Sequence, residues 1–218
     1  MRFPHAHRGV KLIFIAEIVA LASAVVALIA AVFVSIASSG NTAVANSAGT
    51  MLLVASIASI VVFVIQLVGL IMGAKDSHDF RIGLFVTIVG LAAAITSAVL
   101  QSLPATKGLA PIVFAILDTV ATVADLIVII CILFGISSLA AALGNGEMEE
   151  QGRKLAFYIV IIYIVSLILG LMPGFNGYVN PGIALLFSIF SIAAAVIEIF
   201  IYVTTIIYLY RATHMLEE

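Results

Sequence analysis

Six long stretches of apolar residues fill almost the whole chain, and no other feature constrains its fold as strongly. They cover about residues 12–37, 51–74, 82–100, 112–135, 155–172 and 183–209. Each is close to or above the roughly 20 residues that a helix needs to cross a bilayer. Because hydrocarbon offers backbone amide groups no other partner, such segments must be helical. The sequence therefore predicts an all-α bundle of six transmembrane helices, with residues 1–218 as one integral membrane domain.

Composition excludes several classes of function. Hydrophobic residues make up 64% of the chain and charged residues only 9%, whereas a soluble domain has about 25% charged residues. The net charge of −2 means that no overall basic character points to nucleic acid. A single cysteine, Cys131, and the lack of a Cys/His cluster predict neither a metal site nor a disulfide. No catalytic motif or cofactor motif is present, so we expect a protein that is not an enzyme and uses no cofactor.

The basic residues predict the orientation in the membrane. If the N-terminus is cytoplasmic, six spans return the C-terminus to the same side. Eight of the nine Lys and Arg residues are then cytoplasmic, and only Lys107 is outside; the eight are Arg2, Arg8, Lys11, Lys75, Arg81, Arg153, Lys154 and Arg211. This asymmetry follows the positive-inside rule. We expect a multi-pass protein of the cell membrane (plasma or inner) with both termini in the cytoplasm.

A weak internal repeat suggests three tandem hairpins. Lys11-Leu-Ile-Phe14 opens the first stretch, Lys154-Leu-Ala-Phe157 opens the fifth, and Arg81-Ile-Gly-Leu84 opens the third in a similar way. Repeats of this kind are common in transporters. The alternative needs no triplication, because a cation followed by Leu and Phe is an ordinary start for a membrane span.

Four carboxylates lie within the apolar stretches, without any Lys, Arg or His in the same stretches: Glu17, Asp118, Asp125 and Glu198. A charge at bilayer depth costs at least about 2.5–3.5 kcal/mol, so such residues usually have a function. Asp118 and Asp125 are seven residues apart and share one helix face with Thr122. Tyr202 follows Glu198 by about one turn, and Gln66 adds a polar group to the second stretch.

Two interpretations of these acids remain open. If the polar faces converge, Asp118, Asp125, Glu198, Thr122, Tyr202 and Gln66 form a pathway for a cation, a proton-coupled solute or a cationic amphiphile. Otherwise, carboxyl groups in an apolar medium favour the protonated form and act as hydrogen-bond donors between helices. For Glu17 we expect the structural role, because its side chain can reach toward the interface or Lys11.

The alternative function is that of an accessory, scaffold or substrate-binding subunit that acts through helix contacts. Small residues allow helices to approach closely in lipid, and they occur at Gly69 and Gly73 and at Ala16, Ala20 and Ala24. These faces predict packing within the chain, or contact with a second copy or a partner subunit. In length, six-span arrangement and its Ala-xxx-Ala step, the chain resembles the substrate-binding subunits of energy-coupling-factor vitamin uptake systems. Because shape and a common motif carry the likeness, it identifies no family.

Overall fold

The computed structural model describes residues 3–37, 42–102, 111–171 and 181–217. Within these ranges the chain forms six α-helices and no strand. Their bounds are α1 Pro4–Ala37, α2 Thr42–Gly73, α3 His78–Ser102, α4 Pro111–Ala142, α5 Gly146–Leu171 and α6 Pro181–Glu217. All six contain a segment long and apolar enough to cross a membrane. The predicted all-α fold, with six helices long and apolar enough to cross a membrane, is therefore confirmed for the described part of the chain.

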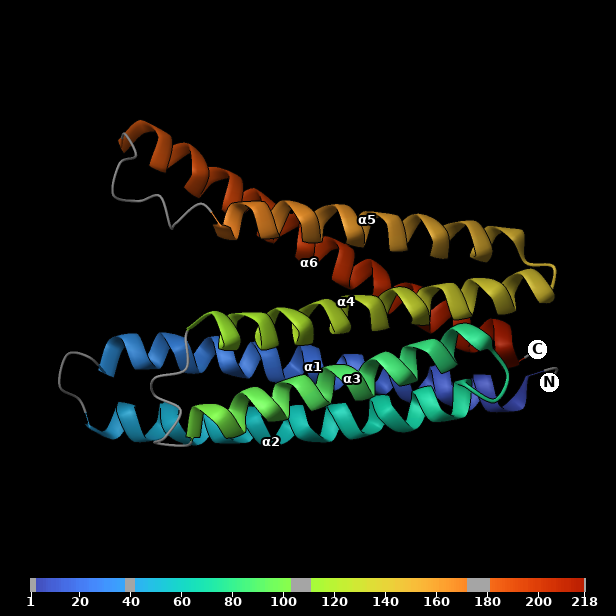
Figure 1. The fold of residues 1–218 in the computed structure, drawn as a ribbon, viewed down its shortest axis with the longest axis horizontal. Helices are drawn as coiled ribbons and strands as arrows, with labels where there is room; N and C mark the ends of the chain where they lie inside the picture. The colour runs from blue at the N-terminus through green and yellow to red at the C-terminus, as the bar shows by residue number, and fades with distance from the viewer. Residues whose placement is uncertain (1–2, 38–41, 103–110, 172–180, 218) are drawn as a thin grey trace.

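The helices run alternately up and down, so that both termini lie at the same end of the bundle (Figure 1). We call this the terminal end. Four helices, α1 to α4, lie close together, with α1 packed along α2 and α3 along α4. Helix α6 crosses the bundle diagonally, from beside α5 to beside α1. Away from the terminal end, α5 and α6 spread apart from the other four helices (Figure 1).

By their place in the helices and connections, the described basic residues all belong to the part of the bundle near the terminal end: Arg8, Lys11, Lys75, Arg81, Arg153, Lys154 and Arg211. This clustering follows from the alternating direction of the helices, because each residue lies near a helix end that points the same way. Lys107 and Arg2 lie outside the described residues. The side of the membrane on which the terminal end lies stays a prediction from the positive-inside rule.

The hydrophobic core is concentrated at the terminal end. Its largest fully buried side chain is that of Phe80, at the start of α3. A Cβ atom at Gly73 of α2 or at Gly135 of α4 would approach the Phe80 ring to 2.8 Å or 2.7 Å. Two glycines on neighbouring helices thus leave the space that this ring occupies. All of the largest fully buried side chains belong to this region, including Ile13, Leu70, Leu133, Ile136 and Leu209.

Polar contacts at the terminal end tie the helix ends to one another. Oδ2 of Asp76, in the connection between α2 and α3, accepts a hydrogen bond from the backbone N–H of Ala6 over 2.7 Å. That amide is in the first turn of α1, where no intrahelical acceptor exists, and a carboxylate there also complements the helix dipole. Nδ1 of His7 lies 3.2 Å from the backbone oxygen of Thr213, which connects α1 to α6.

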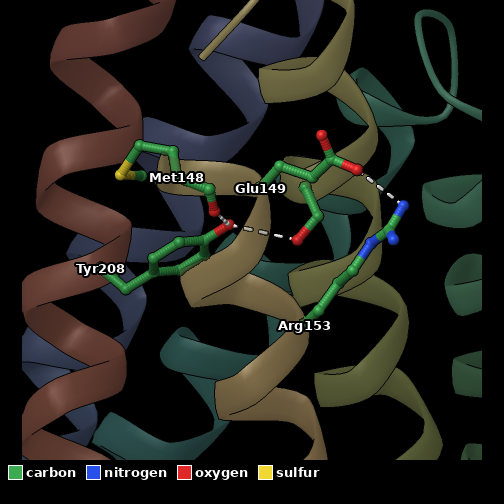
Figure 2. Close-up of polar contacts among 5 residues, drawn as sticks. Met148, Glu149, Arg153 and Tyr208 are labelled. Carbon is green, nitrogen blue, oxygen red and sulfur yellow. Dashed lines mark hydrogen bonds and ion pairs between the residues drawn. The ribbon is translucent and has the colours of Figure 1, made fainter. Parts of the chain in front are cut away.

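Tyr208 makes a similar connection between α6 and α5. Its hydroxyl group donates a hydrogen bond to the backbone oxygen of Met148 over 3.2 Å and lies 3.4 Å from Oγ of Ser137 in α4 (Figure 2). Gly152 of α5 makes room for this hydroxyl, because a Cβ atom there would clash with both Tyr208 and Ser137. On the same helix Arg153 pairs with Glu149 over 2.7 Å (Figure 2). The terminal end is therefore closed by packing and by hydrogen bonds.

The Gly-xxx-Gly step of α2 packs within the chain. A Cβ atom at Gly9 of α1 would lie 2.6 Å from the backbone oxygen of Gly69 and 2.8 Å from the backbone nitrogen of Gly73. The two helix backbones thus touch at this crossing. Ala16 is also fully buried within the chain, whereas Ala24 is exposed. Gly69 and Gly73 are therefore used inside the chain, which leaves contacts with a second copy or a partner subunit as an untested hypothesis.

Candidate functional site

Two cavities begin where the packed core stops. On each of four helices a core residue is followed, away from the terminal end, by a polar residue one or two turns further along. The pairs are Ile13 and Glu17 on α1, Leu70 and Gln66 on α2, Ile132 and Asp125 on α4, and Leu209 and Tyr202 on α6. The polar side chains of these four helices therefore lie at a similar depth in the bundle, next to the packed apolar core.

The first cavity has a volume of about 420 Å³ and lies among α1, α2, α3 and α4, with Tyr202 of α6 at its edge. Leu70 and Ile132 of the core contribute to its lining. Its polar lining comes from five helices and consists of Glu17, Ser23, Ser59, Gln66, Thr87, Asp125 and Tyr202. Cavities of roughly 300–1,000 Å³ are of the size that binds small molecules.

The second cavity, of about 320 Å³, lies among α4, α5 and α6, with Glu17 of α1 in its lining. Its polar lining consists of Glu17, Thr122, Asp125, Tyr163, Glu198, Tyr202 and Thr205. Four residues line both cavities: Glu17, Asp125, Ile129 and Tyr202. We call these four residues the shared wall. Two of its members, Glu17 and Asp125, carry carboxyl groups, so the same two acidic residues line both cavities.

Glu17 is held by donors from two other helices. Nε2 of Gln66 donates a hydrogen bond to Oε1 over 2.7 Å, and the Tyr202 hydroxyl donates one to Oε2 over 2.9 Å. The same hydroxyl lies 3.1 Å from the backbone oxygen of Glu17. Both donors supply their own hydrogen atoms, so Glu17 can accept both bonds as a carboxylate.

The partners of Glu17 differ from the expected ones. They are Gln66 of α2 and Tyr202 of α6, and not Lys11 or the membrane interface. The sequence contained a signal for the first contact, because Glu17 and Gln66 are polar residues at similar depth on consecutive antiparallel spans. No comparable signal pointed to Tyr202, which is 185 residues away along the chain.

Asp125 differs from Glu17 in having no tight partner. Among the residues that the structure describes, its carboxylate has no hydrogen bond or ion pair; Asp125 is exposed and lines both cavities. The described lining of both cavities contains no Lys, Arg or His. An accessible carboxylate without a counter-charge attracts a cation or a proton, and low-dielectric walls strengthen that attraction.

Glu198 and Thr122 also reach the second cavity. Glu198 of α6 accepts a hydrogen bond from the Ser166 hydroxyl of α5, which links the two helices beside the cavity. The Thr122 hydroxyl donates to the backbone oxygen of Asp118 over 2.8 Å, on its own helix. Of the six residues predicted to form a pathway, five therefore line a cavity: Asp125, Glu198, Thr122, Tyr202 and Gln66.

Asp118 is the sixth, and it lies apart from the others. Its Oδ1 accepts a hydrogen bond from the Ser97 hydroxyl of α3 over 2.8 Å, and Ser97 in turn accepts one from Gln101 over 3.0 Å. Asp118 lines neither of the two cavities. Its observed contacts are those of a link between α3 and α4, although it shares a helix and a face with Asp125.

No protein-family model, curated protein or solved structure matches this chain significantly. In the described part of the chain, no three His, Cys, Asp or Glu side chains gather closely enough to hold a metal ion. The fold and the site therefore indicate only the general class of protein to which this chain belongs. Six apolar helices have the character of a multi-pass membrane protein, and in this one two carboxyl groups, those of Glu17 and Asp125, line two neighbouring cavities.

Proposed function

We propose that this protein is a small membrane transporter for a cation or a proton-coupled solute, with Asp125 as the central binding group. The observation that carries the proposal is the shared wall, in which Asp125 and Glu17 face two cavities without a basic residue in the described lining. Ionisable residues inside a membrane protein commonly mark the path of an ion or a proton.

The two carboxylates have different roles in this proposal. Glu17 is fixed by Gln66 and Tyr202, which hold its carboxyl group in one position. Asp125 has no such partner among the described residues and can bind a cation or take up a proton. Glu198 adds a third acidic group to the second cavity alone. A cation that moves from the first cavity into the second would therefore meet an additional acidic group, Glu198.

Size and position support the same proposal. Each cavity can hold a small organic cation or an ion with part of its water shell, at 420 Å³ and 320 Å³. Both lie beyond the closed terminal end, so access to them must come from elsewhere in the bundle. Transport would require the terminal end to open, and the hydrogen bonds of His7, Asp76 and Tyr208 are the contacts that would have to break.

The test is flux in vesicles that contain the purified protein. Protons are followed with a pH-sensitive dye inside the vesicles, and a lipophilic amine is followed as the second probe. Asp125→Asn keeps the size of the side chain but cannot ionise, so we expect flux to fall to the level of protein-free vesicles. Asp118→Asn is the matched control, because Asp118 is on the same helix and lines neither cavity. We expect it to transport as wild type does.

Two results would overturn the proposal: wild-type protein that moves neither probe at any pH, or an Asp125→Asn variant that moves them as well as wild type. In the first case the carboxylates would be structural, and the accessory or substrate-binding subunit would be the better interpretation. Partner chains that copurify with the protein would then be sought.

A further inference from the structure

A groove on the surface of the bundle between α5 and α6 joins a basic end to a long apolar part. The part nearer the terminal end has a volume of about 380 Å³, and the apolar part has about 460 Å³. The two parts are continuous, because Tyr158, Phe200 and Ile201 line both. We propose that this groove binds one glycerophospholipid with an anionic headgroup, a ligand that is independent of the transport function proposed above.

The part nearer the terminal end has the chemistry of a phosphate site. It is lined by Lys154, Gln151 and Tyr158 of α5 and by Arg211 of α6. Arg211 is exposed and has no ion pair within the described residues, so its guanidinium group is available for bidentate contact with a phosphate. Tyrosine hydroxyl groups favour the membrane interface, where one side of the ring is apolar and the other is wet.

Lys154 already has a partner, but a weak one. Its Nζ lies 2.7 Å from Oε1 of Glu150, and the two side chains are 62% and 68% exposed. Exposed pairs one helical turn apart contribute little to stability. A lipid phosphate can therefore replace Glu150 at this ammonium group, while Glu150 returns to solvent.

The second part of the groove has the dimensions and chemistry of an acyl-chain site. Apart from Tyr158 at its head, its described lining is entirely apolar, with Ile161 and Val165 from α5 and Phe190 and Ala193 from α6. The distance along α5 from Lys154 to Val165 is eleven residues, or about 16 Å. That is close to half of the roughly 30 Å hydrocarbon core, the depth of one leaflet. A headgroup at Lys154 and Arg211 would thus place its chain along the groove.

The two basic residues favour a lipid over a partner helix as the occupant of the groove. A purely apolar groove would suit any membrane-spanning segment, but Lys154 and Arg211 lie at the end of the groove nearer the membrane surface, where lipid headgroups are found. Anionic lipids attract Lys and Arg near the membrane surface by about 1 kcal/mol for each residue. Ile162 and Ile201 line both this groove and the second cavity, so a bound lipid would lie against the cavity wall.

The test measures lipid binding to the delipidated full-length protein by native mass spectrometry. The probes are phosphatidylglycerol and phosphatidylcholine with identical chains. We expect wild type to prefer phosphatidylglycerol and the double variant Lys154→Gln/Arg211→Gln to lose about tenfold or more of that preference. The matched control is Arg153→Gln, because Arg153 neighbours Lys154, pairs with Glu149 and does not line the groove. It should bind as wild type does.

A second pair of variants tests the acyl-chain part. Ala193→Phe fills the groove, whereas Ala195→Phe adds the same ring at an exposed position that does not line it. Only Ala193→Phe should weaken phosphatidylglycerol binding. Thermal unfolding of all variants confirms that each is folded. The inference is overturned by equal affinity for the two lipids, by an equal loss in Arg153→Gln or Ala195→Phe, or by glycerophosphoglycerol without chains binding as tightly as the lipid.

Discussion

The hydroxyl group of Tyr202 donates a hydrogen bond to Oε2 of Glu17 over 2.9 Å, and this contact joins the last helix to the first. Both residues belong to the shared wall, so the bond lies between the two cavities. Gln66 binds the other oxygen of the same carboxylate and brings in α2. The first two helices and the last one are thus held together by one acidic group inside the bundle.

Replacing Tyr202 by Phe should loosen this junction. The substitution removes the hydroxyl group that binds Glu17 and keeps the ring. Hydrogen bonds between membrane helices contribute roughly 0.6–1.7 kcal/mol, so we expect a loss of that order in the free energy of unfolding. The measurement is reversible unfolding of the purified protein in detergent micelles.

Tyr163→Phe is the control for that experiment. Tyr163 also lines the second cavity, but among the described residues its hydroxyl has no hydrogen-bond partner. We expect its removal to change the free energy of unfolding by much less than the loss in Tyr202→Phe. Equal losses in the two variants would show that the Tyr202 contact to Glu17 contributes nothing specific.

Substitution of Gly69 by Ala should separate α1 from α2. The new Cβ atom would lie 2.8 Å from the backbone oxygen of Gly9 and 2.8 Å from Cγ1 of Ile13, and a backbone atom cannot move aside as a side chain can. We expect a destabilisation of about 1–3 kcal/mol, which is typical of an overfilled contact. Gly49→Ala on the same helix meets open space and should be neutral or stabilising by up to about 1 kcal/mol.

The Gly69 variant also tests the alternative role of the Gly-xxx-Gly step. Thermal unfolding reports the stability of one chain, and size-exclusion chromatography in detergent reports its association state. We expect Gly69→Ala to lower the stability without changing the association state. A change in association state at unaltered stability would instead assign this face to contact between copies.

The orientation in the membrane can be tested with single cysteines in a Cys131→Ala background. We expect Asn46→Cys to react with an impermeant thiol reagent that is added to intact cells. His78→Cys lies at the terminal end and is exposed, so it should react only after permeabilisation. The physical reason is the excess of Lys and Arg at the terminal end, which resists translocation. The opposite pattern of labelling would reverse the assignment of the cytoplasmic side.

The helices of this protein could be predicted from the sequence because lipid imposes a local rule. Each apolar stretch must satisfy its own backbone hydrogen bonds, so length and hydropathy are enough to locate it. The predicted stretch of residues 51–74 became α2, Thr42–Gly73, and that of residues 82–100 became α3, His78–Ser102. At the terminal end α1 and α6 extend beyond their predicted stretches to Pro4 and Glu217, because polar residues outside the hydrocarbon core can continue a helix.

The sequence likewise identified the unusual residues but not their partners. Asp118 and Asp125 both belong to α4, as the sequence predicts, and seven residues make nearly two turns of that helix. Their environments differ nonetheless, because Ser97 of α3 binds the first and two cavities adjoin the second. Only the packing of neighbouring helices decides which polar group an acid meets at a given depth. For the same reason Glu17, a residue expected to reach the interface, lies at the centre of the site, where α2 and α6 bring Gln66 and Tyr202 to its two oxygens.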